Sequence, residues 1–196
     1  RKSMLSYKES LKILKETNAL LEGHFVLSSG LHSDKYVQCA QLLSKPSKAK
    51  EICLSLAEKI NENFKSFDLI VSPAMGGVVI GYEIGRILGK ETIFAERVNG
   101  KFELRRGFKI QKNQKILIVE DVITTGKSSL ECADMINKHH GNVIGYACII
   151  DRSNDKSLIK KDFVSQIKIE IPTYNKDELP DHLKKLNPVK PGSRNL

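Results

Sequence analysis

Two acidic residues stand at the entrance of a loop whose other residues suit an anion. Residues 116–129 read ILIVEDVITTGKSS, so an apolar run ends in Glu120 and Asp121 and leads into a turn rich in hydroxyl groups around Gly126. Backbone N–H groups at the start of a following helix, together with hydroxyl donors, form a site for phosphate. The two carboxylates would repel phosphate, so the ligand must also offer something that an acid can bind.

A ligand that carries both a ribose and a phosphate satisfies both halves of this segment. Carboxylates accept the hydrogen bonds that vicinal sugar hydroxyls donate, and they also attract hydrated Mg2+. We therefore expect a diol at Glu120 and Asp121 and a phosphate in residues 124–128. The turn alone also fits an ordinary helix N-cap, where Thr and Ser are common. A Walker A loop is excluded, because Asp121 stands where that motif requires its first glycine.

The elements that must position this loop alternate between strands and helices. Patterns typical of strands cover residues 68–72, 91–95, 115–120, 142–150 and 164–171, and patterns typical of helices cover residues 4–21, 46–64, 78–89, 128–140 and 179–186. Residues 23–40 suggest two short strands around a Ser-Gly turn, and residues 96–114 a hairpin or mobile loop. The alternation predicts an α/β fold with a mostly parallel sheet. Ligands of such sheets bind beyond the carboxyl ends of the strands, where residues 73–77, 120–129 and 151–153 fall.

Composition places the chain among ordinary globular proteins. It has 196 residues, 40% of them hydrophobic and 28% charged, which suits one domain with a sizeable core. No apolar run approaches the ~20 residues of a membrane span, and no apolar signal segment follows the basic start RKSMLSYKES. The net charge of +9 is spread along the chain, mostly as lysine, and accompanies no nucleic-acid motif. The four cysteines lie far apart in apolar stretches, which predicts buried free thiols in a reducing compartment.

Several segments resemble one enzyme family. Residues 116–129 resemble the phosphoribosyl pyrophosphate (PRPP) signature of the type I phosphoribosyltransferases. The segments GHFVLSSGLHSDKYV, SPAMGGVVIGYEIG, ERVNGKFELRRGF and CIIDRS resemble orotate phosphoribosyltransferases, and they follow in order from Gly23 to Ser153. The resemblance implies one domain over residues 1–196, with a central mostly parallel sheet flanked by helices and a mobile catalytic loop. It also implies a small N-terminal hood, made of about residues 1–45 and a C-terminal segment, over the base site.

The resemblance also implies a reaction and its setting. Such an enzyme transfers ribose 5-phosphate from PRPP to orotate with Mg2+, giving orotidine 5′-monophosphate and pyrophosphate in pyrimidine (UMP) biosynthesis. We expect a cytoplasmic homodimer whose subunits share the catalytic loop, with no nucleic-acid partner and no membrane association. Mg2+ would be held mainly through PRPP and water, near Glu120 and Asp121.

By the same resemblance, site residues are carried over by position. Catalysis is expected from Lys101, Arg97 and Asp121. Orotate would contact Thr124, Arg152, Tyr36, Val37 and Ser28. PRPP would contact Arg97 and Lys101 together with the following set: Met75, Gly76, Glu120, Asp121, Val122, Ile123, Thr124, Thr125, Gly126, Lys127 and Ser128.

Departures from the family pattern leave some roles open. Some relatives carry a lysine in place of Ser28, a second basic residue in place of Val98 and a histidine in place of Glu103. Either Lys101 and Arg97 then supply more of the charge that stabilises the leaving group, or Arg105 or Arg106 compensates. Read without the family, Tyr36 and Val37 also fit a strand in the core. Rival functions are a purine phosphoribosyltransferase and a PRPP-responsive regulator that binds nucleic acid. The segment LSSGLHS and Arg152 argue against the first, and Lys101 argues against the second.

Overall fold

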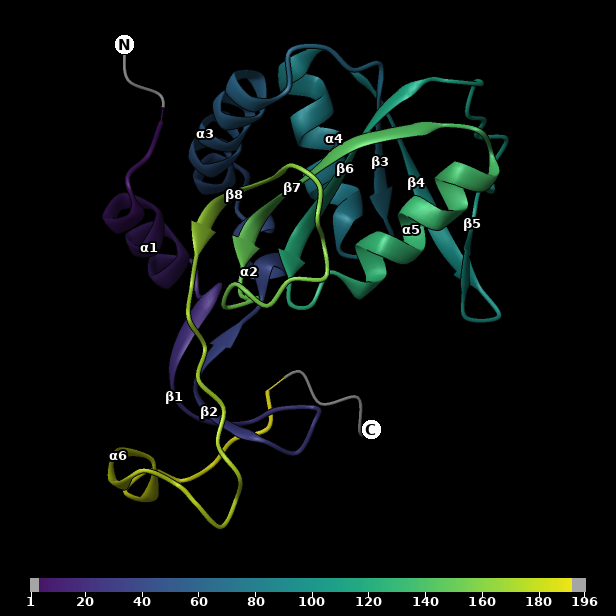
Figure 1. The fold of residues 1–196 in the computed structure, drawn as a ribbon. Helices are drawn as coiled ribbons and strands as arrows, with labels where there is room; N and C mark the ends of the chain where they lie inside the picture. Colours follow the sequence, from purple (N-terminus) through teal and green to yellow (C-terminus); the bar gives the residue numbers. More distant parts are fainter. Residues whose placement is uncertain (1–3, 192–196) are drawn as a thin grey trace.

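A six-stranded sheet forms the centre of the structure, which is a computed structural model describing residues 4–191 (Figure 1). Residues 1–3 and 192–196, which the domain prediction includes, lie outside the described residues. The strand order is β5-β4-β3-β6-β7-β8, parallel throughout except for the antiparallel β4–β5 pair. The predicted mostly parallel α/β sheet is confirmed. Its strands are β3 (Leu69–Pro73), β4 (Glu91–Val98), β5 (Lys101–Glu103), β6 (Lys115–Ile123), β7 (Asn142–Asp151) and β8 (Phe163–Lys168).

Helices cover both faces of this sheet, and the strand sequences show why. Along β6, Ile116 and Ile118 face one apolar cluster while Leu117 and Val119 face the other, so alternate side chains are buried on opposite sides. Helix α5 packs on the first of these faces, and helices α1, α3 and α4 lie on the second (Figure 1). The helices are α1 (Tyr7–Glu16), α2 (Cys39–Leu43), α3 (Pro46–Asn63), α4 (Gly77–Leu88), α5 (Lys127–Lys138) and α6 (Asp181–Lys184).

Local chemistry sets the ends of these helices. Ser6 and Glu9 form a reciprocal capping box at the start of α1. Pro46 begins α3, and Gly89 ends α4 in a left-handed conformation. The predicted helix over residues 4–21 is wrong at its end. Asn18 adopts a left-handed φ of 61°, which stops the helix and releases the next residues into a strand.

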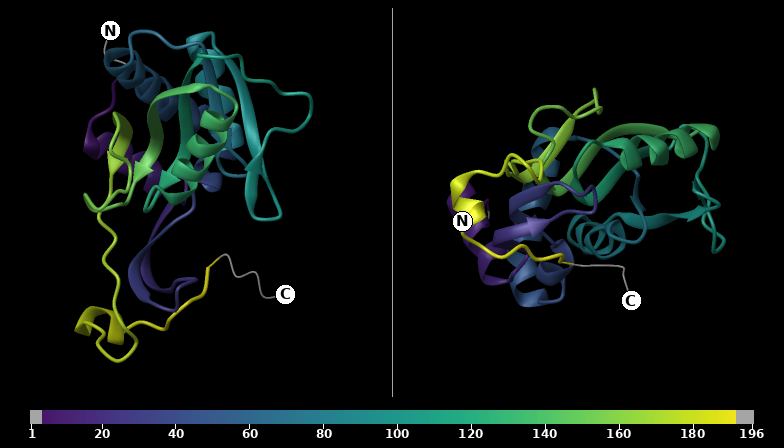
Figure 2. Two further views of the ribbon diagram at one scale, coloured as in Figure 1. Left: turned by 45° about the vertical axis from the view of Figure 1, so that its right-hand side comes forward. Right: turned by 90° about the horizontal axis from the view of Figure 1, so that it is seen from below.

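A second, two-stranded sheet stands apart from the first and forms what we call the hood, defined as residues 20–37 with residues 172–191. Strands β1 (Leu20–Val26) and β2 (His32–Val37) are antiparallel, as the sequence predicts. The C-terminal segment pairs with both, since the backbone N–H of Val26 donates to Val189 O and that of His32 donates to Tyr174 O, each at 2.8 Å. The arrowheads of β6, β7 and β8 point toward the hood (Figures 1 and 2). The hood therefore lies on the side of the sheet where ligands of such folds bind.

Two further features of the chain are not visible in the sequence patterns. The peptide bond between Ala74 and Met75 is cis, although neither residue is proline. The short helix α2 was not predicted, because five residues are too few for a helical period to show. All four cysteines are buried and free, as expected. Over the described residues, no helix combines the length and apolar character needed to cross a membrane.

Candidate active site

The loop between β6 and α5 encloses a cavity of about 290 Å³. Gly126 gives this loop its shape, with φ of +89° and no room for a side chain, because an added Cβ would stand 2.8 Å from Ile159 Cγ1. The turn is tied at Thr125, whose hydroxyl accepts from the Lys127 N–H at 3.2 Å and whose carbonyl accepts from the Leu158 N–H at 2.9 Å. The cavity brings together most of the predicted PRPP set: Glu120, Val122, Ile123, Thr124, Thr125, Gly126, Lys127 and Ser128 line it together with Ser129.

The cavity offers donors suited to an anion. Thr124, Thr125, Lys127 and Ser128 are exposed, so their polar groups are free of the core. The first turn of the 12-residue helix α5 carries backbone N–H groups that no helical carbonyl can satisfy. Together with the positive end of the helix dipole, these groups attract a phosphate.

The two acids lie against the glycine turn that follows β3. A Cβ on Gly76 would stand 2.8 Å from each carboxylate oxygen of Asp121, and one on Gly77 would stand 3.3 Å from Glu120 Oε1. A side chain at Gly76 would therefore displace the Asp121 carboxylate, and one at Gly77 would press first on Ser72 Cβ at 3.0 Å and on Val119 O at 3.1 Å. The structure thus joins two predicted loops, residues 73–77 and 120–129, into one site. The Met75 side chain is 85% exposed, so little of it packs against the rest of the turn.

Burial changes the charge that the acids carry. It raises the pKa of Glu120 to about 8, with a further rise from the neighbouring Asp121 and an opposing effect from Arg97. Burial also raises the pKa of Asp121, against the hydrogen bond at 2.8 Å that its Oδ1 accepts from the Val122 N–H. At neutral pH Glu120 therefore keeps a proton, which it can donate, and the pair repels a phosphate less than two carboxylates would.

Arg97 reaches the far end of the phosphate loop. Its guanidinium donates to Glu131 at 2.6 Å, to the Gly100 carbonyl at 2.8 Å and to the Ser128 hydroxyl at 3.2 Å, and it stacks 4.1 Å from the Phe102 ring centroid. The β4–β5 hairpin is thereby tied to α5. Glu131 was not predicted, because no local pattern in the sequence connects it with a residue 34 positions earlier.

Lys101 is not brought to the phosphate cavity of its own chain. It is exposed at the start of β5 and lines a different cavity of about 700 Å³ between the hairpin and α5. Arg105 and Arg106, the suggested substitutes, both pair with Glu96, and Arg106 does so through two hydrogen bonds of 2.9 and 3.0 Å. In this conformation both arginines pair with Glu96 of β4 and do not reach the phosphate cavity.

The residues predicted to bind orotate are only partly gathered. The Arg152 backbone N–H donates to Ile123 O at 2.9 Å, which fixes this arginine beside the phosphate loop. Its Nε is buried and lacks a hydrogen-bond partner among the described residues, and burial lowers the pKa of the guanidinium, with Tyr36 opposing. Tyr36 and Val37 lie half-buried on β2, and Val37 also packs on the main core. Ser28 is exposed in the β1–β2 turn.

Metal-binding groups are sparse in the site. Over residues 4–191, no cluster of three or more His, Cys, Asp or Glu side chains is arranged to hold a metal ion. Glu120 lines the cavity, and Asp121 supplies a second carboxyl group beside Gly76. This donor set fits a hydrated Mg2+ that takes its remaining ligands from a bound phosphate, because Mg2+ is commonly held that way.

Comparison with known proteins agrees with this geometry. The phosphoribosyl transferase domain family matches residues 38–182. A curated orotate phosphoribosyltransferase of Erythrobacter litoralis is 43% identical over 187 residues, which cover 95% of this chain and 97% of the relative. A solved orotate phosphoribosyltransferase from Aeropyrum pernix has a TM-score of 0.67 at 23% identity, covering 81% of this chain and 92% of the other.

The fold is shared more widely than the substrate. An adenine phosphoribosyltransferase from Thermoanaerobacter pseudethanolicus superposes with a TM-score of 0.59 at 19% identity, covering 69% of this chain and 88% of the other. Structural likeness at such identity shows the fold alone, so the assignment rests on the domain match and on the 43% identical relative. The chain belongs to the phosphoribosyltransferase domain family, among the orotate phosphoribosyltransferases.

Proposed function

We propose that this chain transfers the ribose 5-phosphate group of PRPP to N1 of orotate and releases pyrophosphate. The C1′–oxygen bond to pyrophosphate breaks and a C1′–N1 bond forms, and N1 of orotate gives up its proton. One observation carries the choice of acceptor. Arg152 presents a buried Nε without a hydrogen-bond partner beside the phosphate loop, where a planar carboxylate would satisfy it. The name of the 43% identical relative supports the same acceptor.

The donor would bind across the cavity of residues 120–129. Its 5′-phosphate would accept hydrogen bonds from residues 122–128, and its ribose hydroxyls would meet Glu120 and Asp121. The raised pKa of Glu120 supports this arrangement, because a protonated carboxyl can both donate to and accept from a hydroxyl. Pyrophosphate would lie against the backbone of Met75 and Gly76, where the absence of a side chain on Gly76 leaves room beside Asp121.

The acceptor would bind between the phosphate loop and the hood. Arg152 would take the orotate carboxylate, and Tyr36, Val37, Thr124 and Ser28 would line the remaining pocket. The effect of Tyr36 on the Arg152 pKa supports their proximity. We further propose that the hood covers the base, because it lies beyond the carboxyl ends of the strands (Figure 2).

Lys101 and Arg97 would stabilise the leaving group. As the bond to pyrophosphate breaks, the ribose gains cationic character and pyrophosphate gains negative charge, which cations in a closed site stabilise. Closure of residues 97–107 would also exclude water, which could otherwise capture the sugar cation. Mg2+ bound to PRPP would neutralise pyrophosphate charge, with Glu120 and Asp121 as nearby acceptors for its water ligands.

We propose a homodimer in which the hairpin of one subunit completes the site of the other. Lys101 lines a cavity distinct from the phosphate cavity of its own chain, which supports delivery to a second copy. Val79 and Tyr82 on α4 are 54% and 69% exposed, and they lie one turn apart on one face of that helix. Such a face suits contact with another subunit. The four buried free cysteines support a reducing, cytoplasmic location.

The test is turnover with a loop variant. Purified protein is mixed with PRPP, Mg2+ and orotate, and loss of orotate absorbance is followed. We expect Lys101→Ala to reduce kcat by about 100-fold or more, as expected for loss of a charge that stabilises a transition state. Lys109→Ala removes another exposed lysine from the same connection and should leave the rate unchanged. Binding of PRPP without consumption of orotate would refute the proposal, and adenine, hypoxanthine and DNA would then be tried in turn.

A further inference from the structure

The arginine that would bind the acceptor is flanked by two buried side chains that bond to each other. Ser153 donates twice to Asp151 Oδ1, from its backbone N–H at 2.9 Å and from its hydroxyl at 2.6 Å. Both residues are 6% exposed. We call Asp151 and Ser153 the clamp. The hydrogen bonds of the clamp join the residues before and after Arg152. They therefore restrict the backbone of Arg152, to which its side chain is attached.

The backbone around the clamp is anchored to the sheet. Arg152 donates its N–H to Ile123 O, at the end of β6, and Ile169 donates its N–H to Asp151 O, each at 2.9 Å. Nothing comparable holds the end of the Arg152 side chain, whose Nε lacks a partner among the described residues. The direction of the guanidinium therefore depends on the backbone, and the backbone depends on these anchors and on the clamp.

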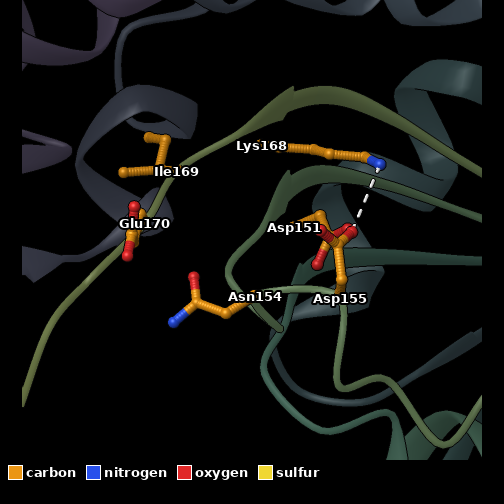
Figure 3. Close-up of a pocket in the computed structure, with 6 residues that line it drawn as sticks. All are labelled: Asp151, Asn154, Asp155, Lys168, Ile169 and Glu170. Carbon is orange, nitrogen blue, oxygen red and sulfur yellow. Dashed lines mark ion pairs between the residues drawn. The ribbon is translucent and has the colours of Figure 1, made fainter.

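A separate cavity of about 300 Å³ adjoins Asp151 (Figure 3). Asn154, Asp155 and Glu170 line it, together with Lys168, which pairs with Asp155 at 3.9 Å. Asp151 lines this cavity, so water that enters it would offer the Asp151 carboxylate alternative hydrogen bonds. Order at Arg152 thus requires that the clamp prevail over water.

We infer that Asp151 is a positioning residue that, through Ser153, directs Arg152 toward the carboxylate of the acceptor. The inference rests on the proposed function, since it assumes that Arg152 meets that carboxylate. The requirement is for a hydrogen-bond acceptor at Oδ1 and not for a negative charge. A fixed guanidinium binds a planar carboxylate with less loss of side-chain freedom, so the effect belongs to acceptor binding.

Three substitutions separate these possibilities by steady-state kinetics. Asp151→Ala removes the acceptor of both bonds and should raise the KM for orotate by about 10- to 100-fold, as small misplacements of binding groups do. Asp151→Asn keeps an acceptor oxygen and should restore a KM near that of the wild type. Ser153→Ala removes one bond and should raise the KM by about fivefold. In every variant the KM for PRPP and kcat should stay close to wild-type values.

Controls distinguish positioning from damage to the fold. Glu170→Ala removes a carboxylate from the same cavity and should not change the KM for orotate. In an Arg152→Ala background, adding Asp151→Ala should have no further effect, because the group being directed is gone. If Asp151→Ala does not fold, the contrast between Ser153→Ala and Asp151→Asn still decides.

Two results would overturn the inference. One is an Asp151→Asn variant as impaired as Asp151→Ala, which would make the charge itself the cause. The other is an equal rise in the KM values for orotate and PRPP. Failure of the wild type to consume orotate would instead refute the proposed function.

Discussion

Replacing Gly126 with alanine tests whether the phosphate loop depends on a missing side chain. The structure predicts two separate costs. Alanine at φ of +89° is strained by about 1–2 kcal/mol, and its Cβ would lie 2.8 Å from Ile159 Cγ1, an overlap that costs about 1–3 kcal/mol more. Gly89 provides a matched control, because its φ is +65° and an added Cβ would meet nothing within 4 Å.

The assay is urea and thermal unfolding of the wild type, Gly126→Ala and Gly89→Ala. We expect Gly126→Ala to be less stable than Gly89→Ala by about 1–3 kcal/mol, the cost of the overlap alone. For a chain of this size each kcal/mol lowers Tm by roughly 2–4 °C. PRPP should raise the Tm of the wild type and of Gly89→Ala equally, and that of Gly126→Ala less, because the loop must shift and its affinity falls.

A second substitution shows whether Ile159 is the cause. Ile159→Ala removes Cγ1 and Cδ1, the two atoms nearest the new Cβ. The double variant should therefore be more stable than the sum of the single effects predicts, by about 1–3 kcal/mol. Equal stability of Gly126→Ala and Gly89→Ala, or strictly additive effects with Ile159→Ala, would refute the packing argument.

Two pH dependences follow from the buried titratable groups. The pKa of Glu120 is raised to about 8 in the folded chain, whereas an unfolded glutamate loses its proton at about pH 4.3. The free energy of unfolding should therefore fall as pH rises between these two values. Glu120→Gln should make the free energy of unfolding, measured with urea, depend less on pH in that range. A variant with the wild-type slope would contradict this. Burial, and then His24, lower the pKa of His32, so its contribution is fully present above about pH 6.5 and is lost as the solution becomes more acidic. His32→Gln should remove that loss in urea unfolding at acid pH, and a variant that keeps the wild-type slope would contradict the assignment.

The elements that the sequence predicts well are those whose signals are local. The apolar run that forms β6 and the proline that begins α3 each act over a few residues. The helix over residues 4–21 was predicted too long because Leu20 and Leu21 continue an apolar spacing that the left-handed Asn18 interrupts. Apolar spacing indicates which side chains are buried. The backbone conformation of a single residue, here Asn18, determines whether a helix or a strand buries them.

Within the site, too, only the contacts between residues close in sequence could be predicted. Residues 120–128 are neighbours in the chain, so one loop gathers them and their joint role could be predicted. The close approach of Gly76 to Asp121 and the hydrogen bond of Arg97 to Glu131 join residues far apart in the sequence, and they depend on strand order and register. No local sequence pattern indicates strand order or register. The position of Lys101 relative to the phosphate cavity likewise depends on where the β4–β5 hairpin packs.

Two acids can stand beside a phosphate site because burial lowers their charge, and not because they lie far from the phosphate. Gly76 and Gly77 leave room for the carboxyl groups of Asp121 and Glu120 against the backbone of their turn. Burial raises the pKa of both groups, and that of Glu120 to about 8, so the charge beside the phosphate loop is smaller than the sequence suggests. A cationic ribose or a hydrated Mg2+ in the site would reverse this effect and favour the carboxylates. Glu120 would then carry negative charge when positive charge is present and little when only phosphate is bound, so burial makes its ionisation respond to the ligand.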